Sequence, residues 1–514
     1  MKSFYVFLIG LTFLNFFFIS CNKDEVGQEV IPEPKPVSKR PYFTKFWMSK
    51  DVHTSLTTDY VAEIEGESRI KIFCPELSST DSVMPSFEGN YTSVKVEGVE
   101  QTSGESVHNF NRIIRYELRD SIGNIAYYDV IIKALNGIPR IDIVTEDSVD
   151  ITSKKEYVNA SFYFSNCPET GVIDATGKIR GRGNATWFYP KKPYRIKFDV
   201  EQRPFRFASN RDWVLLAESC DRTLLRTTYM SEVSKAVGLD FSIRYQHVDL
   251  YLNDDYMGTY IFTDAVEKGR YRVNIADSGF LFELDSHYSQ EPLYFFTNKL
   301  NFPFSFKYPN ANDGSIVEGD ANYSFITSYM NRMEQALLTL LDNPMSLEYQ
   351  SYIDLRSFAK WYITAELTAT YDPNMFYVLA SPVDKIKLFP IWDAEWSLGL
   401  WPVSAWKNMP DPMVTKVIWK SKFYFKYLFK SKSFVAAVKE EWYRTKDKLS
   451  GVKEAVKEVA NSIALTQKAN FERWPGSGGQ ELNVQFDTWE EEVEYINDFF
   501  DKRIEWMDSY INSL

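Results

Sequence analysis

The sequence predicts an α+β protein in which a small β-sandwich precedes a larger unit of mixed strands and helices. Between about residues 42 and 137, short runs of alternating apolar side chains are separated by Gly, Asn, Ser and Asp. This spacing is typical of an antiparallel sandwich of the immunoglobulin-like type. Strand patterns mix with helical patterns after residue 140, and from Lys422 onward the apolar spacing is mainly helical.

Composition limits the classes of function that the chain can have. Its 514 residues leave room for about three domains and a large core. Hydrophobic residues make up 44% and aromatic residues 16%, which excludes global disorder. Lys and Arg total 58 against 70 Asp and Glu, a net charge of −12, so the diffuse basic field of a nucleic-acid binder is missing. We therefore expect no nucleic-acid partner.

The N-terminal segment predicts export and lipidation. Residues 1–20 combine one positive charge with an apolar run, as in a signal peptide. The residues Phe18-Ile19-Ser20-Cys21 resemble a bacterial lipobox, in which Cys21 is acylated and becomes the mature N-terminus. An ordinary secretory signal that is cleaved elsewhere is the alternative. The following Asn22-Lys23-Asp24-Glu25 resembles the signal for the outer face of the outer membrane, so we expect a surface-exposed lipoprotein of the cell envelope, bound to the membrane through lipid on Cys21.

The region between the lipid and the larger unit carries no catalytic cluster. Residues 21–41 are rich in Pro and charge and predict an extended tether. The sandwich over residues 42–137 is interpreted as a spacer, with a ligand-binding module as the alternative. Cys74, Cys167 and Cys220 are interpreted as small buried hydrophobic residues, although a bridge between the last two is conceivable. The remaining unit extends over residues 138–514.

A Gly-containing loop leads into an amphipathic strand. In the segment IRGRGNATW, residues 179–187, the glycines let backbone N–H groups approach a phosphate, and Arg182 can bind phosphate oxygens through its fork. In the strand that follows, residues 194–198, apolar side chains alternate with charged ones, and Lys197 supplies a point charge. The loop and strand predict a nucleotide cradle. A hairpin with a solvated basic face is the alternative.

Two acidic residues predict the other half of a phosphoryl-transfer site. Asp372 and Asp393 each follow or end a loop or strand, where their side chains can converge. Phosphoryl transfer needs one carboxylate to accept the proton of the acceptor hydroxyl and oxygen ligands to hold a metal ion. Glu395 would face the same way as Asp393 if the strand continued through both residues.

Five blocks of the sequence occur in an order that resembles the CotH (spore coat protein H) kinase family, over about residues 138–420. The blocks are IRGRGNATW with PKKPYRIKF, DWVLL with DRTLLR, YLNDDYMGTYIFTDAVEKGRYRVNI, GFLFELD, and FPIWDAEWSLG. The resemblance implies a two-lobed, atypical protein-kinase-like fold that binds ATP with Mg²⁺ or Mn²⁺. It also implies transfer of the γ-phosphate to Ser or Thr of a secreted or surface protein.

The resemblance assigns roles to particular residues. It implies that Asp372 is the catalytic base. The metal-binding residues that it implies are Asp393, Asn374 and Glu395. The residues that it implies around the phosphates are Arg180, Arg182, Gly183, Asn184 and Lys197.

Two positions depart from the family pattern. Glu395 stands where the family usually has Asp, and Asp264 stands where it usually has Glu, the residue expected to pair with Lys197. A nucleotide-binding but inactive protein therefore remains an alternative, as does a non-catalytic surface adhesin or glycan-associated binding protein. A glycan-cleaving enzyme that uses two acids is disfavoured, because it would leave the Gly loop and Lys197 without a role.

Overall fold

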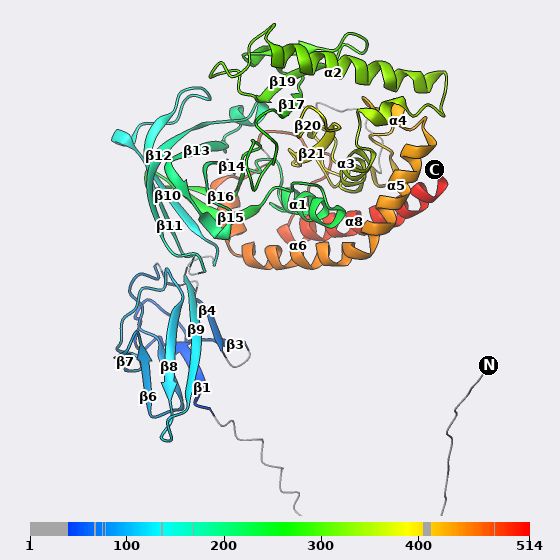
Figure 1. Cartoon of the computed structure of the whole chain (residues 1–514). Coiled ribbons are helices and arrows are strands. Elements are labelled where there is room, and N and C mark those ends of the chain that lie inside the picture. The colour runs from blue at the N-terminus through cyan, green and yellow to red at the C-terminus, as the bar shows by residue number, and fades with distance from the viewer. Residues whose placement is uncertain are drawn as a thin grey trace, which may run out of the picture.

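The computed structural model describes residues 40–65, 68–74, 76–77, 79–134, 137–167, 169–403, 413–476 and 478–514. The predicted signal peptide, Cys21 and nearly all of the predicted tether lie outside the described residues. The described part contains many strands and many helices, which confirms the α+β class. Figure 1 shows a smaller β unit, in blue, beside a barrel and a helical region.

The smaller unit contains two sheets that share one hydrophobic core. Their strand orders are β2-β1-β5 and β3-β4-β9-β8-β6-β7. Phe46 of the first sheet packs against Tyr116 of the second, with ring centres 5.5 Å apart. The β4–β9 pair is parallel, which differs from the predicted antiparallel arrangement. The strands are β1 (Tyr42–Met48), β2 (Tyr60–Val61), β3 (Glu63–Glu65), β4 (Arg69–Cys74), β5 (Ser86–Asn90), β6 (Ser93–Val96), β7 (Val99–Glu100), β8 (Ile114–Arg119) and β9 (Ile125–Ala134).

Asn166 connects this unit to the barrel. Its side chain accepts a hydrogen bond from the backbone N–H of Ala134, at 2.9 Å, and donates to the carbonyl of Ile138, at 2.7 Å. Its own N–H donates to Asn111. Lys133 and Glu169 form an ion pair across the same junction, at 3.2 Å. One buried amide therefore binds backbone on both sides of the connection.

The first part of the larger unit is a closed barrel with the strand order β10-β11-β12-β13-β14-β16-β15. Parallel pairing of β10 with β15 closes it. Aromatic and aliphatic side chains such as Phe162, Ile196, Trp213 and Phe262 fill the interior. The strands are β10 (Arg140–Thr145), β11 (Val158–Ser165), β12 (Ile173–Gly181), β13 (Tyr194–Gln202), β14 (Asn210–Leu216), β15 (Tyr245–Leu252) and β16 (Asp255–Asp264).

A second sheet with the order β18-β19-β17-β20-β21 follows the barrel. Residues 280–284 form β17, the central strand of this sheet, which pairs with β19 and β20. The strands are β17 (Phe280–Leu284), β18 (Tyr294–Phe296), β19 (Pro303–Tyr308), β20 (Asn374–Leu379) and β21 (Lys387–Trp392).

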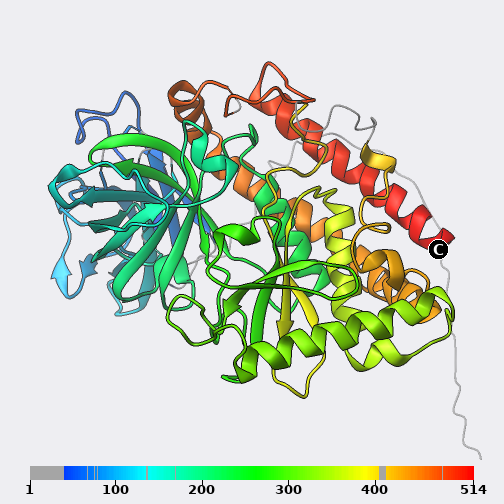
Figure 2. The same ribbon diagram turned by 90° about the horizontal axis from the view of Figure 1, so that it is seen from above.

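Helices cover the second sheet on both sides. Figures 1 and 2 show α2, in light green, on one side, and α8, in red, on the other. Asp354 caps α3, and Thr488 with Glu491 forms the capping box of α8. The helices are α1 (Arg226–Val237), α2 (Ala321–Leu338), α3 (Leu355–Leu367), α4 (Phe425–Leu428), α5 (Lys432–Thr445), α6 (Leu449–Ile463), α7 (Thr466–Arg473) and α8 (Trp489–Ser513).

The C-terminal helices contact both parts of the larger unit. On α7, Asn470 accepts hydrogen bonds from the Thr259 N–H, at 3.1 Å, and from the buried Lys191 ammonium, at 2.9 Å, so α7 is attached to the barrel. On α8, the buried Arg503 forms an ion pair with the buried Glu366 of α3, at 2.9 Å. These helices therefore link the barrel to the helices around the second sheet.

Two further observations concern cysteines and membrane segments. In the part of the chain that the structure describes, Cys74, Cys167 and Cys220 are buried and form no disulfide, as the small-hydrophobic interpretation predicted. Among the described residues, no helix combines the length and the apolar character that a membrane crossing requires.

Candidate functional site

Asp393 lies directly after β21, where the extended backbone ends. Its φ of 67° is in the left-handed region, so the strand ends at Trp392. The Asp393 side chain is exposed to solvent, yet dense surrounding protein raises its pKa to about 6. The carboxylates of Asp372 and Glu283 raise the pKa further, whereas Arg182 lowers it. Asp393 is therefore an acid that water reaches and that lies in a field of like charges.

Arg182 approaches Asp393 from the barrel. It follows β12, and its guanidinium lies 5.5 Å from the centre of the Trp392 ring. Burial lowers the pKa of Arg182 to about 10, Asp393 opposes this effect, and the positive charges of Arg195 and Arg180 add to it. In the described part of the chain, neither the Asp393 carboxylate nor the Arg182 guanidinium forms a side-chain hydrogen bond. Both groups therefore keep free hydrogen-bonding capacity for a ligand.

Asp372 and Asn374 lie at the same end of the second sheet. Asn374 is the first residue of β20 and pairs with Trp392, the residue before Asp393. Asp372 precedes β20 by two residues, and its exposed carboxylate raises the pKa of Asp393 through charge repulsion. Three of the predicted site residues therefore gather at the ends of two hydrogen-bonded strands.

The structure adds two residues that the sequence analysis missed. Glu283, on β17, is buried and accepts a hydrogen bond from the Asn374 amide. Lys422 donates to the Tyr371 carbonyl, at 3.3 Å, and lies 4.1 Å from the centre of the Tyr371 ring. Burial lowers the pKa of Lys422, and Asp372 partly restores it. The block GFLFELD contains Glu283 and was the one available signal for it, whereas no sequence pattern marked Lys422.

Lys197 has a different ion-pair partner from the one expected. It lies on the outer side of β13, and its ammonium group is 3.7 Å from Asp212 on the adjacent strand. Arg195 shares that carboxylate, at 3.0 Å. Asp264, the expected partner of Lys197, instead pairs with Arg244 and Arg272. In the described structure it is therefore Arg182 that supplies the positive charge next to Asp393, and the phosphate role of Lys197 stays a prediction.

The Gly-containing loop is shaped by its own side chains. A Cβ atom on Gly181 would lie 2.2 Å from the Trp187 ring, and one on Gly183 would lie 2.2 Å from the Thr186 hydroxyl. These glycines are therefore explained by close packing in the loop, and their predicted phosphate contact stays a prediction. Asn184 is exposed at the tip of the loop.

Arg180 has backbone partners within the barrel wall. Its guanidinium donates to the carbonyl of Gly181, at 3.0 Å, and to that of Lys154. It also lies 5.0 Å from the centre of the Tyr157 ring. Arg180 therefore adds positive charge near Arg182, while part of its donor capacity is already used.

Glu395 does not continue the strand from Asp393. The condition for a shared strand face is not met, because β21 ends before Asp393 and the φ of Asp393 is positive. The buried Glu395 carboxylate instead accepts the backbone N–H of Cys220. Burial raises its pKa to about 7, and the charges of Asp393 and Asp221 add to this effect. Its role as a metal ligand stays a prediction, and one of its two carboxylate oxygens already binds the Cys220 N–H.

The residues at this site suit a magnesium or manganese ion that arrives with phosphates. Among the described residues, no group of three His, Cys, Asp or Glu side chains could hold a metal by itself. Mg²⁺ is usually held by one or two carboxylates together with substrate phosphates and water. Asp393 fits this chemistry, because neighbouring carboxylates raise its pKa and a cation would relieve that repulsion. Asn374 offers a further oxygen.

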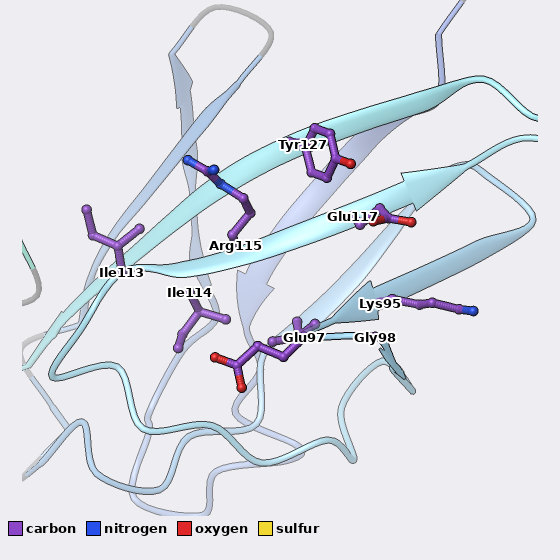
Figure 3. Close-up of a pocket in the computed structure, with 9 residues that line it drawn as sticks. Lys95, Glu97, Gly98, Ile113, Ile114, Arg115, Glu117 and Tyr127 are labelled. Carbon is purple, nitrogen blue, oxygen red and sulfur yellow. The ribbon is translucent and has the colours of Figure 1, made fainter.

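A separate hollow of about 300 Å³ lies in the N-terminal unit. Figure 3 shows Arg115, Glu117, Lys95 and Tyr127 around it. Its charged side chains are already paired on the sheet surface, for example Arg115 with Asp129, at 2.7 Å. It therefore lacks the free charges that distinguish the Asp393 site.

The fold and the site define an α+β protein in which positive charge on a barrel faces carboxylates on a second sheet, an arrangement suited to phosphate and a cation. The family model for CotH kinase protein matches residues 179–507. Because this match covers more than half of the chain, the chain belongs to the CotH kinase family. Membership indicates a kinase-like function, and the match includes the C-terminal helices. A comparison with curated proteins finds no match.

Proposed function

We propose that the protein is an atypical protein kinase that transfers the γ-phosphate of ATP to Ser or Thr of a secreted or surface protein. The barrel and the second sheet with its helices would be the two lobes of a kinase-like fold. One observation carries this proposal: Asp393, with Asp372 beside it, interacts with Arg182 from the barrel, and the two carboxylates are exposed while Arg182 is half-buried. Opposite charges from two lobes are what a metal-bound polyphosphate requires.

Each side chain has a distinct role in this mechanism. Asp393 and the Asn374 oxygen would hold the cation, which neutralises the phosphate charge when bound. Arg182 would donate to phosphate oxygens through its unpaired guanidinium. Asp372, exposed beside Asp393, would accept the proton of the acceptor hydroxyl as its oxygen bonds to phosphorus and the bond to ADP breaks. Lys422 would add positive charge next to Asp372, since the Asp372 carboxylate raises the pKa of Lys422 against the effect of burial.

The place of action is part of the same proposal. The lipobox-like segment that ends at Cys21 supports a lipoprotein of the cell envelope, surface-exposed on the outer membrane. Its protein acceptor would then be a secreted or surface protein. Globomycin treatment of the producing cells tests the lipid, because it should leave a longer precursor that retains the signal peptide. A mature protein of unchanged mass after treatment would contradict lipidation.

Radiolabel transfer tests the enzymatic proposal. Purified protein is incubated with γ-labelled ATP and Mn²⁺, with and without a generic Ser/Thr-rich acceptor, and incorporation is compared with that of Asp393→Ala. Asp174→Ala is the matched control, because Asp174 is exposed on β12. We expect labelling by the wild type and the control, and none by Asp393→Ala. Equal labelling by all three would contradict the metal role of Asp393. Absence of any ATP binding would favour a non-catalytic surface-binding protein.

A further inference from the structure

We propose that Glu283 is a positioning residue that orients the Asn374 amide and leaves its carbonyl oxygen free to bind the cation. The inference rests on the proposed function, because it concerns the same cation. It goes beyond that function by adding a residue that does not itself contact the cation or the substrate. Three features of the structure support it: a hydrogen bond, an ion pair and the order of the strands.

The hydrogen bond fixes which end of the amide is available. Asn374 donates through its Nδ2 group to the Glu283 carboxylate. An ionised carboxylate has no proton to donate, so it can pair only with the NH₂ end of an amide. The Oδ1 atom of Asn374 is therefore left for another partner. Oxygen is the atom that Mg²⁺ and Mn²⁺ bind, so the orientation determines whether Asn374 can be a ligand.

An ion pair holds the second oxygen of Glu283. Glu283 is 5% exposed, and a buried carboxyl group needs charged or hydrogen-bonding partners. The Lys307 ammonium lies 3.0 Å from the second oxygen of Glu283 and 3.3 Å from Glu291. Although burial opposes it, these two carboxylates raise the pKa of Lys307 well above its ordinary value. Lys307 therefore occupies the second oxygen of Glu283, and the first oxygen is left for the Asn374 amide.

The order of the strands makes the arrangement rigid. Glu283 lies on β17, Asn374 on β20, and Asp393 follows β21, and these three strands are hydrogen-bonded neighbours. The Glu283 charge also raises the pKa of Asp393, so the two carboxylates lie within one electrostatic environment. Residues held on paired strands keep their geometry better than residues on loops. Partners of metal ligands commonly change metal affinity by about 10- to 100-fold when they are lost.

Binding of Mn²⁺ alone, followed by electron paramagnetic resonance on the purified chain, tests the inference. We expect Glu283→Gln to weaken Mn²⁺ binding by about tenfold, because a neutral amide can present either end to Asn374. Glu291→Gln is the matched control: it removes one charge from the same lysine without contacting Asn374, so its affinity should stay within about twofold of the wild type. Glu283→Asp keeps the charge on a shorter side chain and should also weaken binding. Wild-type affinity in both Glu283 variants would overturn the inference.

A double-mutant cycle separates positioning from simple charge loss. In the Asn374→Ala background, Glu283→Gln should cause no further loss, because there is no amide left to orient. An undiminished tenfold loss in that background would overturn the positioning role in favour of a direct effect on the ion. Asp393→Asn distinguishes failure of the positioning role from failure of the proposed cation site. If Asp393→Asn binds Mn²⁺ as well as the wild type does, the proposed cation site itself is refuted.

Discussion

Replacing Asp393 by Asn should stabilise the metal-free protein while it abolishes phosphoryl transfer. Surrounding protein raises the pKa of Asp393 to about 6 from an ordinary value of 3.8. That difference corresponds to about 3 kcal/mol between the protonated and the ionised forms. Because solvent reaches the carboxylate and screens its charge, we expect about 1 kcal/mol of this to appear in the free energy of unfolding. The amide of Asn has nearly the same shape and carries no charge.

The effect of pH follows from the raised pKa. At pH 8 Asp393 is ionised in both the folded and the unfolded chain. The Asp393 charge therefore lowers the free energy of unfolding of the wild type by its full amount. As the pH falls through 6, the folded chain takes up the proton first, so the wild type gains stability and the advantage of the variant shrinks. Below the unfolded value of 3.8 the two proteins should unfold alike.

Scanning calorimetry in EDTA measures this difference. At pH 8 the melting temperature of Asp393→Asn should exceed that of the wild type by about 1 to 2 °C. Most of the gain should disappear at pH 4.5. The matched control, Asp174→Asn on the exposed face of β12, should shift neither value. A variant that melts below the wild type at pH 8, or a gain that is equal at both pH values, would refute the reasoning.

Three further predictions concern phosphate, metal and the core. Arg182→Met should raise the KM for ATP by about tenfold or more, since hydrogen bonds to charged groups contribute about 1.5–3 kcal/mol. Lys197→Met should have a smaller effect, because Asp212 already pairs with Lys197; steady-state kinetics would contradict this placement if the two effects were equal. Dialysis against EDTA should remove labelling and added Mn²⁺ should restore it, whereas activity that persists without metal would exclude a cation requirement. Arg503→Met should lower the free energy of unfolding by about 3–5 kcal/mol, because it leaves Glu366 buried without its partner; urea titration with an unchanged midpoint would contradict this.

The sequence was most informative where a side chain lies at the end of a strand. Asp372 and Asp393 were expected to converge, and the structure places both at the same end of the paired strands β20 and β21. Glu395 was placed by strand alternation alone. Alternation of side chains cannot reveal where an extended backbone ends. The positive φ of Asp393 interrupts the strand, so the alternation does not extend to Glu395.

Pairing between distant segments was the part that local patterns could not supply. Alternation predicted that Lys197 faces away from the apolar side of its strand, but the partner, Asp212, comes from the next strand in the barrel. Likewise, residues 280–284 read as a strand whichever sheet contains them, and only tertiary pairing places β17 in the second sheet. The parallel pair β10–β15 joins segments about a hundred residues apart. The local alternation of side chains therefore could not predict that the barrel closes.

The attachment of α7 to the barrel bears on how the two halves of the site keep their separation. Asn470 binds both Thr259 and Lys191, and the Trp474 indole donates to the Met257 carbonyl, at 2.7 Å. The segment that anchors these contacts continues into α8, which is bonded to the helices behind the second sheet. This late stretch of the polypeptide therefore ties the barrel, which carries Arg182, to the helices around the sheet that carries Asp372 and Asn374. Substitutions far from Arg182 and Asp393, such as Asn470→Ala, should therefore alter nucleotide affinity by letting these two residues move apart.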